Sequence, residues 1–435
     1  MIRLVYSLVF YLAQPLVWMR LAWRARKQPE YLQHVGERYA FHDGHAQKPP
    51  ARLLWLHAVS VGETRAAEPL IKALLDEYPD HSLLLTHMTP TGRAVGAELI
   101  GKYGPRLLQA YLPYDLPDAC ARFLDHFKPR IGLLMETEIW PNLISAGRRR
   151  GIAMLLVNAR LSAKSQRGYQ RFLPLVRPAL EKLSIVAAQT AADAERLTSI
   201  GARDVHITGN LKFDVTPAPD KLQLGADWRR ALGRPIWLAA STREGEEPFI
   251  LDAFARLDLP GALLLLVPRH PQRFNEVAAM IKERKLPFCR RSEGILPSPE
   301  TRIWLGDSMG EMPAYFAAAD VALIGGTLLP FGGQNLIEAA ACGCPVLVGP
   351  HTYNFAQATE DALACGAARR IVDAEDAAAT VKALLTESEA LETMRAAAAG
   401  FSQAHRGATA RTIALVLETT ATATTTTAAA PRTTD

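Results

Sequence analysis

The chain has 435 residues, 49% hydrophobic and 21% charged, which indicates a folded protein too long for one ordinary core. The net charge of +5 and the lack of basic stripes interleaved with aromatic residues argue against a nucleic-acid partner. The five cysteines form no disulfide framework, so reduced thiols and a cytoplasmic body are expected. Cys342 and Cys344 lie in an Ala-rich stretch without further ligands nearby, and we expect small core side chains there, not a metal site.

Residues 1–30 are expected to form a membrane-associated anchor segment. Residues 4–19 are apolar and uncharged, but this run is shorter than the about 20 residues that a spanning helix needs. Trp23 at its end is flanked by Arg20 and Arg24, a pattern typical of a segment lying at an anionic lipid surface. A buried N-terminal helix is the alternative.

Short apolar runs alternate with amphipathic helical patterns along the rest of the chain. This rhythm predicts an α/β architecture with two Rossmann-like, doubly wound parallel-sheet domains that face a cleft. We expect strands at 53–56, 82–86, 108–112, 131–135, 153–157, 185–188 and 205–207, and again at 236–240, 262–267, 303–305, 321–324 and 346–348. The predicted divisions are an N-terminal domain at 31–215, a Pro-rich linker at 216–224, a C-terminal domain at 225–415 and a disordered low-complexity tail at 416–435.

Glu63 is the first candidate for chemistry. The apolar run that starts at Arg52 reads as a buried strand, and the residues after Gly62 carry apolar side chains at helical spacing. Glu63 is thus predicted in the first turn of a helix, just past the carboxyl end of a strand, where α/β sheets bind ligands. An ordinary helix-start acid is the alternative, and the helix dipole is expected to keep this carboxylate ionised.

Other polar side chains follow predicted strands in the first half. Glu136 and Glu138 come directly after a buried strand, Arg160 follows the next one, and Lys212 closes the domain. Helix-start acids and a surface lysine are the alternative interpretations.

Loops in the second half are predicted to bind a nucleotide. Neither half has a GxGxxG or Walker sequence, so NAD and P-loop interpretations lack their motif. Residues 240–246, 267–270, 306–311 and 325–338 instead place hydroxyls, an Arg, glycines and Glu338 after strands, where backbone N–H groups could cradle a phosphate. Ordinary turn chemistry accounts for any one of these loops about as well.

A series of motifs in this order resembles the 3-deoxy-D-manno-octulosonic acid (Kdo) transferases of lipopolysaccharide synthesis, from the N-terminal segment to about residue 400. The motifs are 57–63 (HAVSVGE), 88–92 (MTPTG), 111–115 (YLPYD), 135–142 (METEIWPN), 158–162 (NARLS), 209–214 (GNLKFD), 267–271 (VPRHP) and 349–355 (GPHTYNF).

The resemblance implies a GT-B glycosyltransferase that moves Kdo from CMP-Kdo to the lipid A precursor at the cytoplasmic face of the inner membrane. It implies Glu63 as general base and Glu136 and Lys212 as transition-state stabilisers. The lack of an Asp-x-Asp motif in the loops of the expected cleft predicts a metal-independent reaction, and no cofactor is expected. The residues that match the CMP-binding segments are Pro268, Arg269, Met309, Gly310, Glu311, Asn335, Leu336, Ile337 and Glu338. Another membrane-associated GT-B transferase, a nucleotide-sugar epimerase and a non-catalytic nucleotide-binding scaffold are the alternatives.

Overall fold

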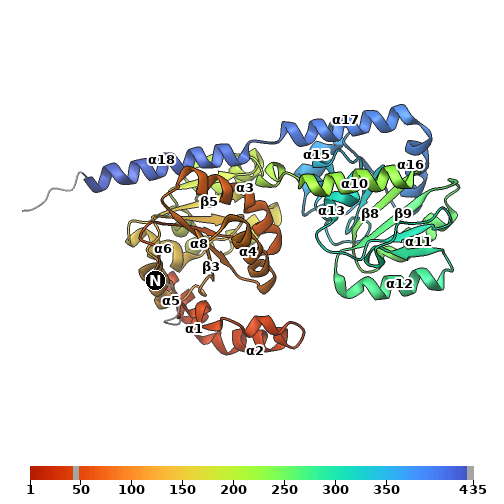
Figure 1. Cartoon of the computed structure of the whole chain (residues 1–435). Coiled ribbons are helices and arrows are strands. Elements are labelled where there is room, and N and C mark those ends of the chain that lie inside the picture. Colours follow the sequence, from red (N-terminus) through yellow and green to blue (C-terminus); the bar gives the residue numbers. More distant parts are fainter. Residues whose placement is uncertain (43–48, 429–435) are drawn as a thin grey trace, which may run out of the picture. The chain divides into compact units, whose positions relative to one another are not determined.

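The computed structural model describes residues 1–42 and 49–428, with side chains up to residue 421. The chain divides into two compact units (Figure 1). Unit 1 consists of Met1–Val215 together with Arg406–Asp435, and unit 2 of Thr216–His405.

Unit 1 is built on a parallel seven-stranded sheet with the strand order β3-β2-β1-β4-β5-β6-β7. Its strands are β1 (Leu53–His57), β2 (Ser82–His87), β3 (Leu107–Tyr111), β4 (Ile131–Met135), β5 (Ala153–Ala159), β6 (Ile185–Ala188) and β7 (Val205–Ile207). Its α-helices are α1 (Ile2–Leu12), α2 (Gln14–Ala25), α3 (Val61–Glu77), α4 (Pro90–Tyr103), α5 (Pro117–Phe127), α6 (Pro141–Arg149), α7 (Ala163–Gln170), α8 (Leu173–Leu180), α9 (Ala191–Ser199) and α18 (Ala408–Ala428). Short 3₁₀ turns lie at η1 (Pro29–Leu32), η2 (Val35–Tyr39) and η3 (Leu211–Asp214).

Both faces of this sheet are covered by helices, which explains why its strands are apolar throughout rather than alternating. In β1, Leu54 and Leu56 pack against α3, α4 and α18. Leu53 and Trp55 point to the opposite face and pack against α5, α6, α8 and α9. Burial on both faces fixes the strand register, because a one-residue slip would exchange the two sets of side chains.

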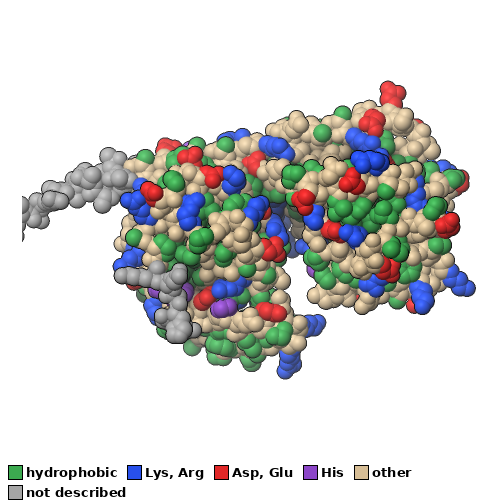
Figure 2. Space-filling model, in the orientation of Figure 1, with side chains coloured by type: hydrophobic (Ala, Val, Ile, Leu, Met, Phe, Trp, Pro, Cys, Tyr) green, Lys and Arg blue, Asp and Glu red, His purple; other side chains and the backbone are tan. Residues whose placement is uncertain are grey.

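Helices α1 and α2 expose an unusual number of large apolar side chains. Leu4, Leu12 and Trp23 are 71%, 72% and 63% exposed, and Figure 2 shows hydrophobic side chains gathered over these helices, with basic side chains at one end. Phe10 and Val17 face inward and pack beside Tyr114. Within the described part of the chain no single helix has the length and apolarity of a membrane span, but α1 and α2 taken together do, with a 47° bend between them.

Unit 2 contains a second parallel seven-stranded sheet, with the order β10-β11-β9-β8-β12-β13-β14. Its strands are β8 (Ile236–Thr242), β9 (Leu263–Pro268), β10 (Phe288–Arg290), β11 (Ile303–Leu305), β12 (Val321–Ile324), β13 (Val346–Val348) and β14 (Ala368–Arg370). Its α-helices are α10 (Pro219–Leu232), α11 (Glu246–Arg256), α12 (Phe274–Glu283), α13 (Met312–Ala318), α14 (Leu336–Ala341), α15 (Ala356–Ala364), α16 (Ala374–Thr386) and α17 (Ser388–Ala404). Two 3₁₀ turns lie at η4 (Pro271–Arg273) and η5 (Arg291–Glu293).

Helices α11, α12, α16 and α17 bury the apolar core on one face of this second sheet. Helices α10 and α13 approach so closely that a Cβ added to Gly225 would lie 2.3 Å from the carbonyl oxygen of Ala314. A glycine is required there because any side chain would push the two helices apart.

The structure differs from three of the sequence-based expectations. Helix α10 begins at Pro219, inside the stretch expected to be a linker, because a proline suits the first position of a helix as well as an extended linker. The tail expected to be disordered is helical up to Ala428, and α18 belongs to unit 1; residues 429–435 of that expectation lie outside the described part. The three-residue strands β10 and β14 were not expected.

Candidate active site

The topology of unit 1 brings the candidate carboxylates to one place. Strands β1 and β4 are neighbours in the sheet, although β2 and β3 separate them in the chain, so the connections after β1 and β4 run to opposite faces. Such a switch point leaves a crevice at the carboxyl ends of the strands, where ligands of α/β proteins bind. Glu63 follows β1, and Glu136 follows β4.

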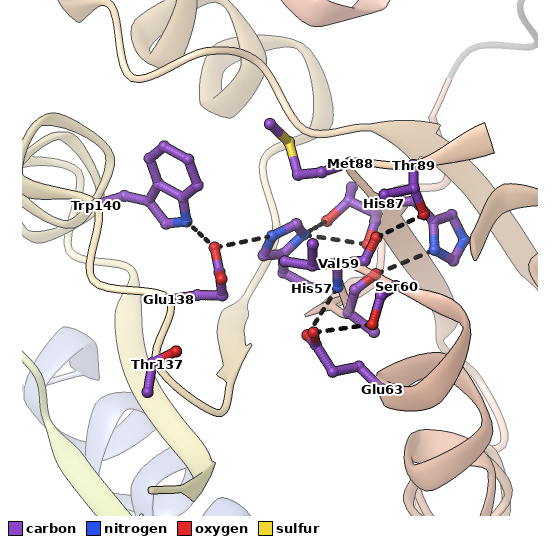
Figure 3. A network of polar contacts seen from close by, with 12 residues as sticks. His57, Val59, Ser60, Glu63, His87, Met88, Thr89, Thr137, Glu138 and Trp140 are labelled. Carbon is purple, nitrogen blue, oxygen red and sulfur yellow. Dashed lines mark hydrogen bonds and ion pairs between the residues drawn. The ribbon is translucent and has the colours of Figure 1, made fainter. Parts of the chain in front are cut away.

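Glu63 lies in the first turn of α3, whose N-cap is Ser60. The backbone N–H of Val59 donates to Oε2 of Glu63 at 2.9 Å, and the Ser60 hydroxyl donates to Oε1 at 3.1 Å (Figure 3). Burial and the negative charges of Glu136 and Glu138 raise the pKa of Glu63 from 4.5 to about 7.

The helix dipole was expected to keep Glu63 ionised, but the raised pKa leaves the carboxylate only partly ionised at neutral pH. Raising a carboxyl pKa from 4.5 to about 7 corresponds to roughly 3 kcal/mol. A helix N-terminus offers a carboxylate only about 0.3–1 kcal/mol, so burial and the neighbouring carboxylates outweigh it. A pKa near neutrality is what a general base at physiological pH requires.

Glu136 has the opposite environment. Its Oε1 accepts from Nζ of Lys212 at 3.3 Å, and its Oε2 accepts from Nε of Arg160 at 2.8 Å. Burial alone would raise the pKa of Glu136, but the two cations prevail and hold it below its ordinary value. Its backbone has φ = +56°, a left-handed conformation that is costly for a residue with a side chain and that recurs at functional sites.

Glu138 forms a third environment on the same loop. Its Oε2 accepts from the indole N–H of Trp140 at 2.7 Å and lies 3.8 Å from Nε2 of His57, a fully buried residue at the end of β1 (Figure 3). The His57 ring is held from its other side by Thr86, whose Oγ1 lies 2.9 Å from Nδ1.

Three carboxylates thus meet at one sheet edge, and nearby cations neutralise their negative charges to different extents. Glu136 is paired with two cations, whereas the donors that reach Glu63 from the described residues are one amide and one hydroxyl. When neighbouring acids have different pKa values, one can exchange protons while the other stays charged. The arrangement therefore leaves Glu63 as the group able to take up a proton, with Glu136 and Lys212 as a fixed ion pair beside it.

Unit 2 has its own switch point, between β8 and β12. The loops that follow these strands lie close together: Gly325, directly after β12, is so near the end of β8 that an added Cβ would lie 2.2 Å from the carbonyl oxygen of Ser241. The buried carboxylate of Glu246 joins the two loops, because it accepts from the backbone N–H groups of Arg243, Gly326 and Leu328 at 2.7, 2.7 and 3.0 Å.

The prediction that these amides cradle a phosphate is wrong for the three that donate to Glu246. The neighbouring Glu247 is also engaged within the fold, since Arg273 donates to both of its oxygens. The sequence located these loops, because each follows a predicted strand. It did not reveal the hydrogen-bond partners of Glu246 and Glu247, because both glutamates are fully buried by residues that are distant in the chain.

The residues predicted to bind CMP are of two kinds. Exposed or partly exposed groups are Arg269, whose Nε donates to Gln334 at 3.2 Å, and Met309, Gly310, Glu311, Asn335 and Glu338. Pro268, Leu336 and Ile337 are buried, so their side chains belong to the core of the unit. Asn335 caps α14 by accepting from the N–H of Ile337 at 3.2 Å, as its position near a helix start predicted.

Two further features bear on the site. Arg160 received no role from the sequence, although its place after a predicted strand was the signal that could have assigned one. Among the described residues no group of three or more His, Cys, Asp or Glu side chains is arranged to hold a metal ion.

Comparisons with known proteins match both halves of the chain to described families. Residues 33–215 match the family model described as 3-deoxy-D-manno-octulosonic-acid transferase, and residues 250–401 match that of glycosyl transferases group 1. The 3-deoxy-D-manno-octulosonic acid transferase of Bordetella pertussis is 46% identical over 420 residues, which cover 94% of this chain and 98% of the relative. That of Haemophilus influenzae is 37% identical over 422 residues, covering 95% and 98%.

Solved structures of low sequence identity share the fold. A glycosyltransferase from Rickettsia africae superposes with a TM-score of 0.59 at 14% identity and covers 85% of this chain and 99% of its own. The Anabaena protein Alr3699/HepE, solved with UDP, gives a TM-score of 0.57 at 14% identity, with coverages of 85% and 100%. Together with the identities above, these likenesses show that the chain belongs to the Kdo transferase family, glycosyltransferases of lipopolysaccharide biosynthesis with the GT-B fold.

Proposed function

We propose that this enzyme transfers one or more Kdo residues from CMP-Kdo to the lipid A precursor (lipid IVA), with Glu63 as general base. The observation that carries the proposal is the meeting of Glu63 and the Glu136–Lys212 ion pair at the switch point of unit 1, in a chain of the Kdo transferase family. The pKa of Glu63, raised to about 7, suits a group that takes up a proton near neutral pH. A sugar hydroxyl is a poor nucleophile, and a positioned carboxylate that accepts its proton contributes about 10²–10⁴-fold to the rate.

Lys212 and Glu136 stabilise the transition state. As Kdo leaves CMP, negative charge develops on the departing phosphate and positive charge on the sugar. The ammonium of Lys212 and the carboxylate of Glu136, 3.3 Å apart, offer one charge of each sign to this separation. Arg269, which is exposed at the end of β9, and the segments 309–311 and 335–338 of unit 2 bind the nucleotide.

The enzyme acts at the cytoplasmic face of the inner membrane. A lipid acceptor leaves a bilayer at high cost in free energy, so the enzyme must reach the membrane surface. The exposed apolar side chains of α1 and α2, with Arg20, Arg26 and Lys27 beside them, have the composition of such an interfacial element.

The test is transfer by the purified full-length enzyme from CMP-Kdo to lipid IVA, with mass spectrometry counting the sugars added. Glu63→Gln keeps the shape of the side chain but removes the base, and we expect a loss of about 10²–10⁴-fold in kcat. Glu68→Gln is the control on the same helix: Glu68 contacts Lys102 and Tyr103, and the variant should transfer at the wild-type rate.

Wild-type protein that adds no Kdo would contradict the proposed reaction. Transfer retained in Glu63→Gln would contradict the assignment of the base while leaving the reaction intact.

A further inference from the structure

The carboxylate of Glu138 lies beside the proposed base, yet the chemistry proposed above gives it no part. Its negative charge acts on Glu63, and 20% of its side chain is exposed. Only Oε2 is engaged, by the indole N–H of Trp140 and by the nearby edge of the His57 ring. Among the described residues no group donates a hydrogen bond to Oε1 of Glu138.

The groups that hold Oε2 are themselves fixed. Trp140 is the N-cap residue of α6 and packs against the core of unit 1. His57 is 0% exposed, in a strand paired on both sides, and its ring contacts Thr86. Figure 3 shows the carboxylate reaching from its loop toward these two side chains. The free oxygen of Glu138 is thereby held in a defined place.

Other carboxylates of unit 1 show that an idle oxygen alone does not mark a binding group, because Glu68, 21% exposed, accepts only at Oε1 and faces Lys102 and Tyr103. What sets Glu138 apart is that its idle oxygen lies at the switch point beside Glu63.

The more buried carboxylates use both oxygens. Glu37 accepts at both oxygens, from Arg93 and from the N–H of Tyr111, and Glu247 likewise uses both oxygens. An ionised carboxylate is an acceptor with about four lone-pair sites, so one idle oxygen in a partly exposed site has capacity for an outside donor.

We propose that Oε1 of Glu138 accepts a hydrogen bond from a hydroxyl of a sugar substrate and so orients that sugar against Glu63. This inference rests on the proposed function. Oε1 of an ionised carboxylate accepts hydrogen bonds and offers no donor, and the donor groups of a sugar ring are its hydroxyls, so the group recognised is a hydroxyl. Both the transferred sugar and the acceptor carry hydroxyls, and the experiment separates the two sources.

The test is Glu138→Gln in the full-length enzyme. The one oxygen of the new amide satisfies the Trp140 N–H, and its NH₂ group can meet a hydroxyl only as a donor, so a charge-assisted hydrogen bond is replaced by a neutral one. We expect kcat/KM to fall roughly 10-fold, because a hydrogen bond to a charged group is about twice as strong as a neutral one. A rise of similar size in the KM and in the calorimetric dissociation constant for CMP-Kdo assigns the hydroxyl to the donor; the same rises for lipid IVA assign it to the acceptor.

Glu68→Gln is a matched control, because Glu68 has 21% exposure on the same unit and an equally local set of partners. It should leave both KM values unchanged. Trp140→Phe removes the donor that fixes Oε2 but keeps the carboxylate, and we expect a smaller rise in the KM of the same substrate that Glu138→Gln affects.

Unchanged KM values and dissociation constants for both substrates in a Glu138→Gln variant with wild-type urea midpoint would overturn the inference. If Glu138→Gln is destabilised, the test rests on Trp140→Phe. Unchanged KM values for both substrates in Trp140→Phe would then overturn the inference. Absence of transfer in the wild-type enzyme would instead refute the proposed function, so the two failures are distinguishable.

Discussion

Glu63 ties the activity of this enzyme to pH. The pKa of Glu63 is raised to about 7, so the fraction of enzyme with an ionised base grows as pH increases through neutrality. We expect kcat/KM to rise about tenfold per pH unit below pH 7 and then to level off. The measurement is kcat/KM between pH 5 and 9, in buffers of constant ionic strength.

The charges near Glu63 also set the midpoint of this pH profile. Besides burial, the negative charges of Glu136 and, to a lesser extent, Glu138 raise the pKa of Glu63. Glu138→Gln should therefore move the midpoint of the profile to lower pH, besides its effect on KM. A midpoint that stays at the wild-type value in that variant would contradict the electrostatic coupling.

At the residue scale, the sequence identified positions better than properties. Glu63, Glu136 and Lys212 could be placed at one sheet edge because parallel strands end together. The pKa of Glu63 could not be inferred, since it depends on burial and on the charges of Glu136 and Glu138, which lie more than 70 positions away in the chain. The capture of backbone amides by Glu246 was hidden for the same reason, because its partners come from a loop after another strand.

At the element scale, α1 and α2 combine exposed apolar side chains with an adjacent cluster of bases. Trp23 is 63% exposed, and Leu12 is 72% exposed. Because burying such a side chain in lipid releases about 1.5 kcal/mol or more, we expect Leu12→Ser to weaken binding to anionic vesicles roughly tenfold. Co-sedimentation with phosphatidylglycerol vesicles measures this, and added salt should weaken binding further through the basic residues.

Phe172 provides the control for this prediction. It is 64% exposed on unit 1, outside α1 and α2, and Phe172→Ser should leave vesicle binding unchanged. Equal loss of binding in Phe172→Ser and Leu12→Ser would argue for general apolar adhesion rather than for a membrane-binding element.

At the scale of the whole molecule, the chain leaves unit 1 at Val215 and returns to it at Arg406. The return is specific: Asp214, directly after the loop of Lys212, accepts from the N–H groups of Gly407 and Thr409, at 2.7 and 2.5 Å. Composition alone misled here, because an Ala/Thr-rich end resembles a disordered tail. Its few large apolar residues are nevertheless placed at helical spacing and buried in the core that α3 and α4 share.

Ending the chain at His405 should therefore destabilise unit 1 and spare unit 2, which retains α17. The truncation uncovers the sheet face beneath α18 and leaves Asp214 without its two amide donors. Urea unfolding followed by tryptophan fluorescence should show an early loss of the transition of unit 1, with transfer activity lost in parallel.

Point variants in α18 test whether its packing is what stabilises unit 1. Ile413 is 7% exposed, and Ile413→Ala should cost unit 1 about 2–5 kcal/mol through lost burial and the cavity left behind. Leu417 is 38% exposed on the same helix, and Leu417→Ala should stay within about 0.5 kcal/mol of wild type. Equal stability of both variants would mean that α18 does not hold unit 1 together, and the loop of Lys212 would then have to be positioned by the N-terminal part of the chain alone.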